Sequence, residues 1–156
     1  MNINYKKPIG VYAAWRLNED ERAKSSSGGI ASVISEKWIE NGGVVYGASF
    51  VKPFGFQHIR CSKKEQLDRI RGSKYVFSSF SKVIRLIEED LKDDTNVLFV
   101  GTPCQVAAVV SRFSKYKEQL VCIDLLCHGT PDEKILKDSI DEDMIANGID
   151  NVVFRN

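Results

Sequence analysis

Two cysteines, each placed just after an apolar run, are the residues best suited to chemistry in this sequence. Cys104 follows the run Val97–Val100 in the stretch Gly101-Thr102-Pro103-Cys104-Gln105. Thr102 is a favourable helix N-cap and Pro103 suits the first helical position, so we expect Cys104 in the first turn of a helix. The free amides and the dipole of a helix start favour a thiolate or another anion. Cys104 is therefore a candidate nucleophile or metal ligand, or else a half-buried residue that fills a tight turn.

The second cysteine stands in Cys127-His128-Gly129, at the end of the apolar run Leu120–Cys127. The carboxyl ends of parallel strands share one edge of an α/β sheet, so we expect Cys104, Cys127 and His128 at the same edge. There they are candidate ligands of a metal or cluster, or neighbours of a bound cofactor. His128 is equally well explained as a hydrogen-bonded turn residue.

The other two cysteines carry less signal. Cys122 lies within the same run and is expected in the core, as free cysteines usually are, while Cys61 follows a polar turn. No two of the four cysteines form a Cys-x-x-Cys pair, which argues against a local zinc ribbon or a thioredoxin-type dithiol. Asp124 is an acid in a strand expected to be buried, so it needs a hydrogen-bonding or charged partner. Its role is either functional or purely structural.

Two polar loops have the composition of phosphate-binding segments. Ser25-Ser26-Ser27-Gly28-Gly29 precedes a helical pattern, and such loops offer hydroxyls, amides and a helix start to an anion. Gly72-Ser73-Lys74-Tyr75 adds a cation and an aromatic ring that could stack on a planar ligand. Each loop is also explained as an ordinary connection between elements.

Length and composition indicate one globular domain spanning residues 1–156. The chain is 43% hydrophobic and 28% charged, which is enough for a core of its own. Its 22 Lys and Arg against 21 Asp and Glu give no excess charge to favour nucleic acid. The sequence shows no signal peptide and no membrane-spanning stretch, so we expect a cytoplasmic protein without structural disulfides.

The periodicity predicts an α/β fold with a mostly parallel sheet flanked by helices. Strands are expected at Ile9–Trp15, Val44–Val51, His58–Cys61, Val97–Val100, Leu120–Cys127 and Asn151–Phe154. Helices are expected at Ile30–Glu40, Lys64–Ile70, around Val83–Leu91, from Pro103 towards Phe113 and at Asp132–Asn147, with a charged loop at Arg16–Lys24. Helix and strand alternate after residue 80, which predicts parallel strands joined by right-handed crossovers. The last strand begins as the chain ends, so we expect a sheet that is incomplete at the C-terminus.

Taken together, the motifs resemble the coenzyme F(420) hydrogenase/dehydrogenase beta-subunit family, in that family's order and over nearly the whole chain. The matching stretches are Lys24–Gly29, Gly42–Ala48, Arg71–Val76, Gly101–Gln105 and Asp124–Gly129. The resemblance implies a redox module that binds FAD and an iron–sulfur cluster and passes electrons between them and an acceptor. In archaeal members that acceptor is the deazaflavin coenzyme, and some bacterial relatives are associated with polysaccharide biosynthesis.

The same resemblance assigns roles to residues and predicts partners. By motif, the flavin-binding residues are Ser26, Ser27, Gly28, Gly29, Ser73, Lys74, Tyr75 and Thr102, and the cluster ligands or their neighbours are Cys104 and Cys127. The implied partners are a flavin nucleotide and a redox partner subunit or ferredoxin, and the chain could form oligomers. Fuller members carry a cysteine-rich ferredoxin-like segment and a later Cys-x-x-Cys pair, both absent here. Two thiolates cannot complete the four-cysteine ligation of a 4Fe–4S cluster.

Three hypotheses follow from the sequence. The first is an electron-transfer flavoprotein module. The second is a thiol-dependent enzyme in which the helix start, and His128 beside it, activate Cys104 as nucleophile. The third is a non-catalytic binding or assembly module built on a truncated α/β core, which an exposed apolar sheet edge would favour. The residues by themselves support an anion-binding edge with two cysteines, and only the resemblance selects flavin and electron transfer.

Overall fold

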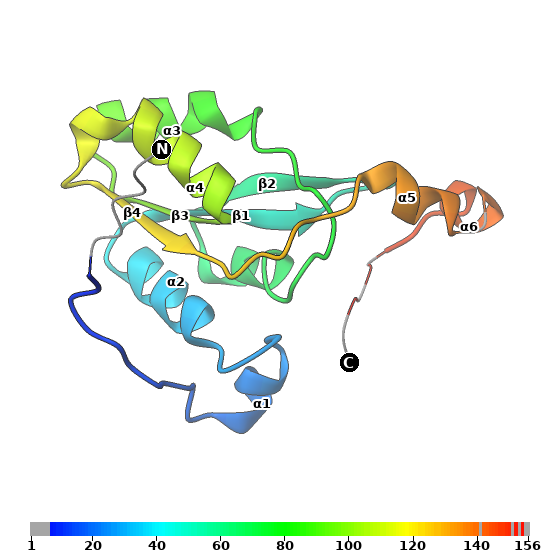
Figure 1. The fold of residues 1–156 in the computed structure, drawn as a ribbon, viewed down its shortest axis with the longest axis horizontal. Helices are drawn as coiled ribbons and strands as arrows, with labels where there is room; N and C mark the ends of the chain where they lie inside the picture. Colours follow the sequence, from blue (N-terminus) through cyan, green and yellow to red (C-terminus); the bar gives the residue numbers. More distant parts are fainter. Residues whose placement is uncertain (1–6, 141, 151, 153, 155–156) are drawn as a thin grey trace.

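A four-stranded sheet with the strand order β2-β1-β3-β4 forms the centre of the molecule (Figure 1). The computed structural model describes residues 7–140, 142–150, 152 and 154. Its strands are β1 (Val44–Phe50), β2 (Phe56–Cys61), β3 (Val97–Gly101) and β4 (Leu120–Asp124). β1 and β2 form an antiparallel pair, whereas β1, β3 and β4 run parallel. The predicted mostly parallel α/β sheet is confirmed.

Helices cover both faces of this sheet (Figure 1). They are α1 (Glu19–Ala23), α2 (Ile30–Glu40), the 3₁₀ helix η1 (Lys64–Arg69), α3 (Val83–Lys92), α4 (Pro103–Arg112), the short 3₁₀ turn η2 (Ser114–Tyr116), α5 (Glu133–Asp138) and α6 (Glu142–Ala146). α3 and α4 lie on one face, and α2 lies on the other with η1. The helices predicted at Ile30–Glu40 and around Lys64, Val83 and Pro103 are confirmed. Gly42, with φ at +82° in the left-handed region, follows the end of α2.

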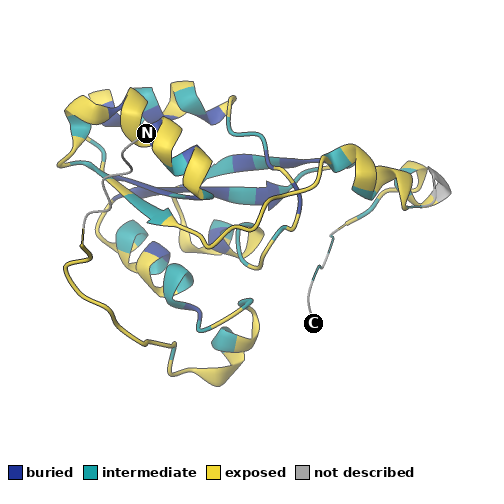
Figure 2. Ribbon diagram, in the orientation of Figure 1, coloured by how far each residue is buried: buried dark blue, intermediate teal, exposed yellow. Residues whose placement is uncertain are grey.

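Each face of the sheet has its own hydrophobic cluster. On the α3 and α4 face, fully buried Tyr46 and Phe99 pack with Ile87 and Val109. On the other face, Val45 and Leu98 pack against Leu67 of η1 and against α2. β3 is therefore buried on both faces, as its apolar sequence predicts, and Figure 2 shows the buried residues concentrated along β1 and β3.

β4 lies at the edge of the sheet, and this corrects two expectations. The run Leu120–Cys127 is half-buried to exposed rather than buried, and its strand ends at Asp124. Asp124 is exposed, so water can solvate its carboxylate and no buried partner is required. Cys122 packs against the hydrophobic cluster on the α3 and α4 face, in agreement with its predicted place in the core. Burial raises the pKa of its thiol to about 11.

The first predicted strand, Ile9–Trp15, is wrong. This segment has no strand pairing, and the side chains of Ile9, Val11 and Tyr12 are exposed. An apolar run becomes a strand only where a neighbouring strand accepts its backbone hydrogen bonds, and none does here. The following loop, Arg16–Lys24, contains the short helix α1, which Asn18 caps by accepting the Glu21 amide at 2.9 Å.

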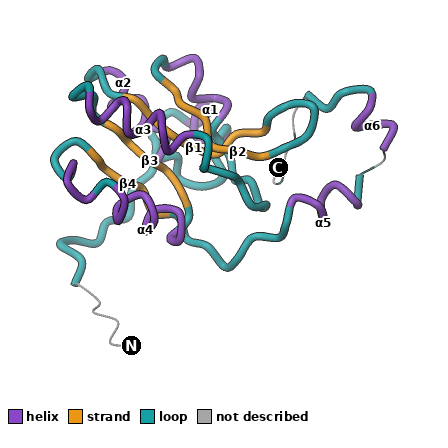
Figure 3. The backbone as a smooth tube through the Cα atoms, turned by 90° about the horizontal axis from the view of Figure 1, so that it is seen from above, coloured by secondary structure: helices purple, strands orange, loops and turns teal. Residues whose placement is uncertain are grey.

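The long C-terminal helix predicted at Asp132–Asn147 is also wrong, because two short helices take its place. Asp132 caps α5, and this helix has no buried residue to stabilise a longer one. α5 and α6 project from the body as an arm (Figure 3). The predicted strand Asn151–Phe154 falls largely outside the described residues. No helix among the described residues is long and apolar enough to cross a membrane.

Candidate functional site

A cleft of about 740 Å³ lies beside the carboxyl end of β1, between the loop before α2 and the loop after η1. Its lining residues are Ala23, Lys24, Ser25, Ser26, Ser49, Phe50, Asp68, Arg69, Arg71, Gly72, Ser73, Lys74, Asp150, Val152 and Phe154. The two polar loops singled out in the sequence thus meet at one cavity. The polar part of the lining holds cations, hydroxyls and two carboxylates, Asp68 and Asp150, which pair with Arg71 and Lys52, and Phe50, Val152 and Phe154 supply an apolar part.

A hydrogen bond ties these two loops together. The Ser73 amide donates to Ser26 Oγ at 2.7 Å, across 47 positions in the sequence. Among the residues predicted to bind a cofactor, Ser26, Ser73 and Lys74 line the cleft. The polar loops therefore form a single surface, which sequence spacing alone could not show.

Lys74 contributes a half-buried ammonium group to the cleft wall. Its Nζ donates to the backbone carbonyls of Arg71 at 2.5 Å, Gly72 at 3.2 Å and Arg69 at 3.4 Å. Within the described part of the chain no carboxylate forms an ion pair with it. Burial accordingly lowers the pKa of Lys74 to about 8. A half-buried cation held only by neutral carbonyls favours the approach of an anion such as a phosphate.

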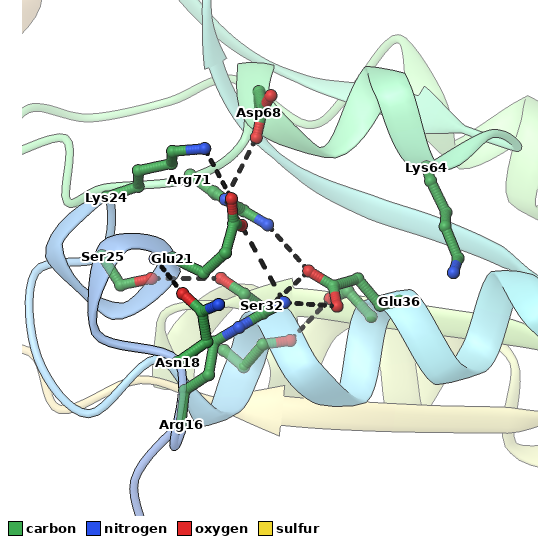
Figure 4. Close-up of polar contacts among 12 residues, drawn as sticks. Arg16, Asn18, Glu21, Lys24, Ser25, Ser32, Glu36, Lys64, Asp68 and Arg71 are labelled. Carbon is green, nitrogen blue, oxygen red and sulfur yellow. Dashed lines mark hydrogen bonds and ion pairs between the residues drawn. The ribbon is translucent and has the colours of Figure 1, made fainter.

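Arg71 anchors the cleft to the neighbouring elements through a cluster of charged side chains (Figure 4). Its terminal nitrogens donate to Glu36 of α2 at 2.7 Å and to Glu21 of α1 at 2.7 Å, with Asp68 at 3.2 Å. Glu36 also accepts a bidentate pair of bonds from Arg16, at 2.6 and 3.0 Å, and this lowers the pKa of Glu36. Sequence reasoning missed this cluster because its members are dispersed along the chain.

Ser27, Gly28 and Gly29 lie outside the cleft lining, and the two glycines have structural reasons to be glycine. A Cβ on Gly28 would stand 2.8 Å from the Ala14 carbonyl oxygen, and the Gly28 carbonyl accepts the Arg16 amide at 2.7 Å. Gly29 caps α2 with φ at +76°, in the left-handed region. Their contact with a cofactor therefore stays a prediction.

Tyr75 and Thr102, also predicted at the flavin site, do not line the cleft either. Tyr75 is 50% exposed, and its ring meets that of Phe154 edge-on at 6.0 Å between centroids. Thr102 caps α4, where its amide donates to Gln105 Oε1 at 3.1 Å. The cap and the place of Cys104 in the first turn agree with the sequence, whereas a flavin contact by Thr102 stays a prediction.

Cys104 and Cys127 follow neighbouring parallel strands, as predicted. Both are exposed, and the Leu125 amide donates to the Gly101 carbonyl at 2.9 Å where the two segments leave the sheet. Cys104 Sγ lies 3.3 Å from Thr102 Oγ1. No hydrogen bond joins His128 to either cysteine in the described part of the chain, so a nucleophile activated by His128 stays a prediction.

The residues at this edge do not fit an iron–sulfur cluster by themselves. Among the described residues, no group of three or more His, Cys, Asp or Glu side chains is placed to hold a metal. A 4Fe–4S cluster takes four ligands, and Cys61 is buried elsewhere in the core. Metal ligation by Cys104 and Cys127 stays a prediction.

Sequence reasoning also missed a buried hydrogen-bond network of His58, Ser78 and Gln105 at the connection between β3 and α4. His58 of β2 has Nε2 3.1 Å from the Val100 carbonyl and Nδ1 3.4 Å from Ser78 Oγ. Gln105, whose Oε1 holds Thr102, donates from Nε2 to the Ser78 carbonyl at 2.8 Å. These contacts fix the connection from β3 to α4, and a lone histidine in a strand gives no sequence signal for them.

The fold is of the α/β class, with a mostly parallel sheet and a cleft beside the carboxyl end of β1. Within this class the chain belongs to the coenzyme F420 hydrogenase/dehydrogenase beta-subunit family. The family's N-terminal model matches residues 11–85, and its C-terminal model matches residues 94–154. No curated protein matches the chain.

Among solved structures, the chain is similar to a chain of the F420-reducing [NiFe] hydrogenase complex from Methanosarcina barkeri. The two share 20% sequence identity with a TM-score of 0.66, over 85% of this chain and 50% of the hydrogenase chain. The likeness shows a common fold, and the present chain spans about half the length of that relative.

Proposed function

We propose that the chain is a flavin-binding electron-transfer module, with FAD held in the cleft beside β1. The observation that carries the proposal is the Lys74 ammonium group, which lines this cleft with only backbone carbonyls as acceptors. The pyrophosphate of FAD supplies the missing negative charge, and Ser26 and Ser73 stand beside it as hydroxyl donors. The apolar part of the lining suits the planar rings of the ligand.

The cleft residues fit such a nucleotide in both charge and size. The cavity of about 740 Å³ is within the range of about 300–1,000 Å³ that is common for cofactor sites. When bound, FAD would supply a ring system that accepts and donates electrons. The protein's own contribution is to bind the phosphates, orient the ring and exclude water. A deazaflavin or another redox carrier serves as acceptor, and a redox partner subunit or ferredoxin exchanges electrons with the module.

Lys74→Met tests this proposal through FAD titration of the oxygen-free protein, followed by flavin absorption and fluorescence. A lost charge-assisted hydrogen bond predicts binding about 10- to 100-fold weaker than in the unaltered protein. Lys64→Met is the matched control, because Lys64 pairs with Glu40 on the surface and lies outside the cleft lining. A colourless protein that ignores added FAD would overturn the proposal.

The same titration has a pH signature. The ammonium form of Lys74 predominates below its pKa of about 8, so FAD affinity should weaken as pH rises through that value. The dependence should vanish in Lys74→Met and persist in Lys64→Met. Equal pH dependence in all three proteins would show that Lys74 does not bind the phosphates.

A further inference from the structure

We infer that Arg71 and Glu36 act as positioning residues for the cleft, so that Glu36 controls ligand affinity without touching the ligand. The inference rests on the proposed function for the ligand's identity, but the arrangement of the cleft wall can be tested without it. Glu36 lies in α2 and is not among the lining residues. Any effect that it has on binding must pass through the arginines it holds.

The contacts of Arg71 fix both its side chain and its backbone. Its Nη2 donates to Glu36 Oε1 at 2.7 Å, and its Nη1 donates to Glu21 Oε2 at 2.7 Å. Nη1 also pairs with Asp68 at 3.2 Å, and Nε is buried with no partner among the described residues, so Nε is not accessible to a ligand. Only 10% of the Arg71 side chain is exposed. The guanidinium group therefore faces the protein's own carboxylates, which is the behaviour of a structural clamp.

The backbone around Arg71 carries the groups that face the ligand. The Arg71 carbonyl is the acceptor nearest to Lys74 Nζ, at 2.5 Å. Two residues further on, the Ser73 amide reaches Ser26 Oγ. Because the Arg71 side chain is tied to α1 and α2, it sets where this backbone lies relative to the Ser26 loop. Loss of the Arg71 ion pairs should therefore weaken both the Ser26–Ser73 hydrogen bond and the bonds from Lys74 Nζ to the backbone carbonyls.

Arg16 completes the clamp from the other side. Its guanidinium binds both carboxylate oxygens of Glu36, and its amide donates to the Gly28 carbonyl. Glu36 thus lies between the arginine that holds the Ser26 loop and the arginine that holds the Ser73 loop (Figure 4). Neutralising Glu36 removes the negative charge that both arginines share, while every residue that lines the cleft keeps its identity.

The test uses the full chain with Glu36→Gln, Arg71→Ala and the matched control Glu88→Gln. Glu88 lies in α3 and, like Glu36, pairs with two basic side chains, those of Lys92 and Arg112, but it does not line the cleft. We expect Glu36→Gln to weaken FAD binding by about tenfold and to raise the exchange rate of the Ser73 amide by a similar factor. Glu88→Gln should change neither quantity. In the double variant Glu36→Gln/Arg71→Ala, the loss of FAD affinity should be smaller than the sum of the two single losses.

Each result has a separate meaning. If Arg71→Ala weakens FAD binding while Glu36→Gln changes neither quantity, Arg71 contacts the ligand directly and the inference fails. If the buried amide of Val45 exchanges faster by the same factor as Ser73, the variant is destabilised globally, and the inference fails again. If the unaltered protein binds no FAD, the proposed function fails, and Ser73 exchange in ligand-free Glu36→Gln still decides whether Glu36 positions the wall.

Discussion

His58 and Lys74 are ionisable side chains that the fold holds with neutral partners. Burial lowers the pKa of both, to about 4 for His58 and about 8 for Lys74. For Lys74 the unfolded chain binds more protons between pH 8 and its ordinary pKa, so the free energy of unfolding rises with pH in that window. The charged form of Lys74 therefore lowers the stability of the ligand-free protein, and a bound anion would offset this loss. This is expected of a residue that binds a ligand rather than one that stabilises the fold.

His58 should make the protein sensitive to mild acid. It is buried against Phe99, with 5.0 Å between the ring centroids, and this burial favours the neutral form because it removes the charged imidazole from water. Below its ordinary pKa of 6.5 the unfolded chain takes up more protons, and stability falls as pH drops towards 4. The shift corresponds to about 3 kcal/mol of unfolding free energy over that window.

Urea unfolding across this pH range measures the effect. His58→Gln should be less stable at neutral pH, since it disturbs the bonds to Val100 and Ser78, but its stability should vary less between pH 6.5 and 4. His128→Gln is the control for loss of a histidine, because His128 is exposed and the variant should keep the stability of the unaltered protein at neutral pH. A His58→Gln variant as acid-sensitive as the unaltered protein would contradict the assignment.

At the scale of elements, one carboxylate joins α3 to the β1–β2 hairpin. Asp90 accepts from the Tyr46 hydroxyl at 2.5 Å, and it accepts from Arg60 at 2.8 and 2.7 Å. Tyr46 is fully buried, and its burial, with Asp90 beside it, raises the pKa of its hydroxyl well above the usual range. The hydroxyl thus stays protonated and acts as a donor that fixes the helix on the sheet.

Asp90→Ala should lower the free energy of unfolding by about 3 kcal/mol, because it leaves a buried hydroxyl and a half-buried guanidinium without their acceptor. Glu89→Ala, one position away in the same helix, is the matched control. Glu89 pairs only with exposed Arg85 in the described structure and should cost about 0.5 kcal/mol or less. Chemical denaturation of both variants provides the comparison, and equal losses would refute the role given to Asp90.

At the scale of the whole molecule, two hydrogen bonds attach the start of the C-terminal arm to the body. The Phe77 amide donates to the Pro131 carbonyl at 3.0 Å, and the Phe56 amide donates to Glu133 Oε2 at 3.2 Å. The Glu133 carboxylate thus links the start of α5 to β2. The arm brings Asp150, Val152 and Phe154 to the cleft, so its attachment affects one wall of the proposed site.

Glu133→Ala should release this arm without unfolding the sheet. Losing one hydrogen bond worth about 1 kcal/mol predicts that the arm opens, and is cut by trypsin at Lys134 and Lys137, about fivefold faster. Glu118→Ala, at an exposed position outside the arm, should leave the rate of cleavage at Lys134 and Lys137 unchanged. Unchanged cleavage in Glu133→Ala would show that other contacts hold the arm.

Much of the fold was predictable, because its signals are local. The run Val97–Val100 and the cap at Thr102 specify a buried strand followed by a helix, and both lie where the pattern placed them. Ile9–Trp15 has an equally apolar pattern but no strand beside it, and Asp124 is exposed because β4 is an edge. Pairing and edge position depend on distant parts of the chain, so a local pattern cannot contain them.

By itself, the sequence determined the class of fold, the family and the two loops from which the cleft is built. Those features depend on residue types at short spacing: serine, glycine and lysine in the loops, and apolar periods in the strands and helices. Only the tertiary structure decided that Ser26 meets Ser73, that Lys74 has only carbonyl acceptors, and that Glu36 lies between two arginines. Hydrogen bonds, burial and charge pairing are set by residues that are far apart in the sequence, and they become defined only when the chain folds.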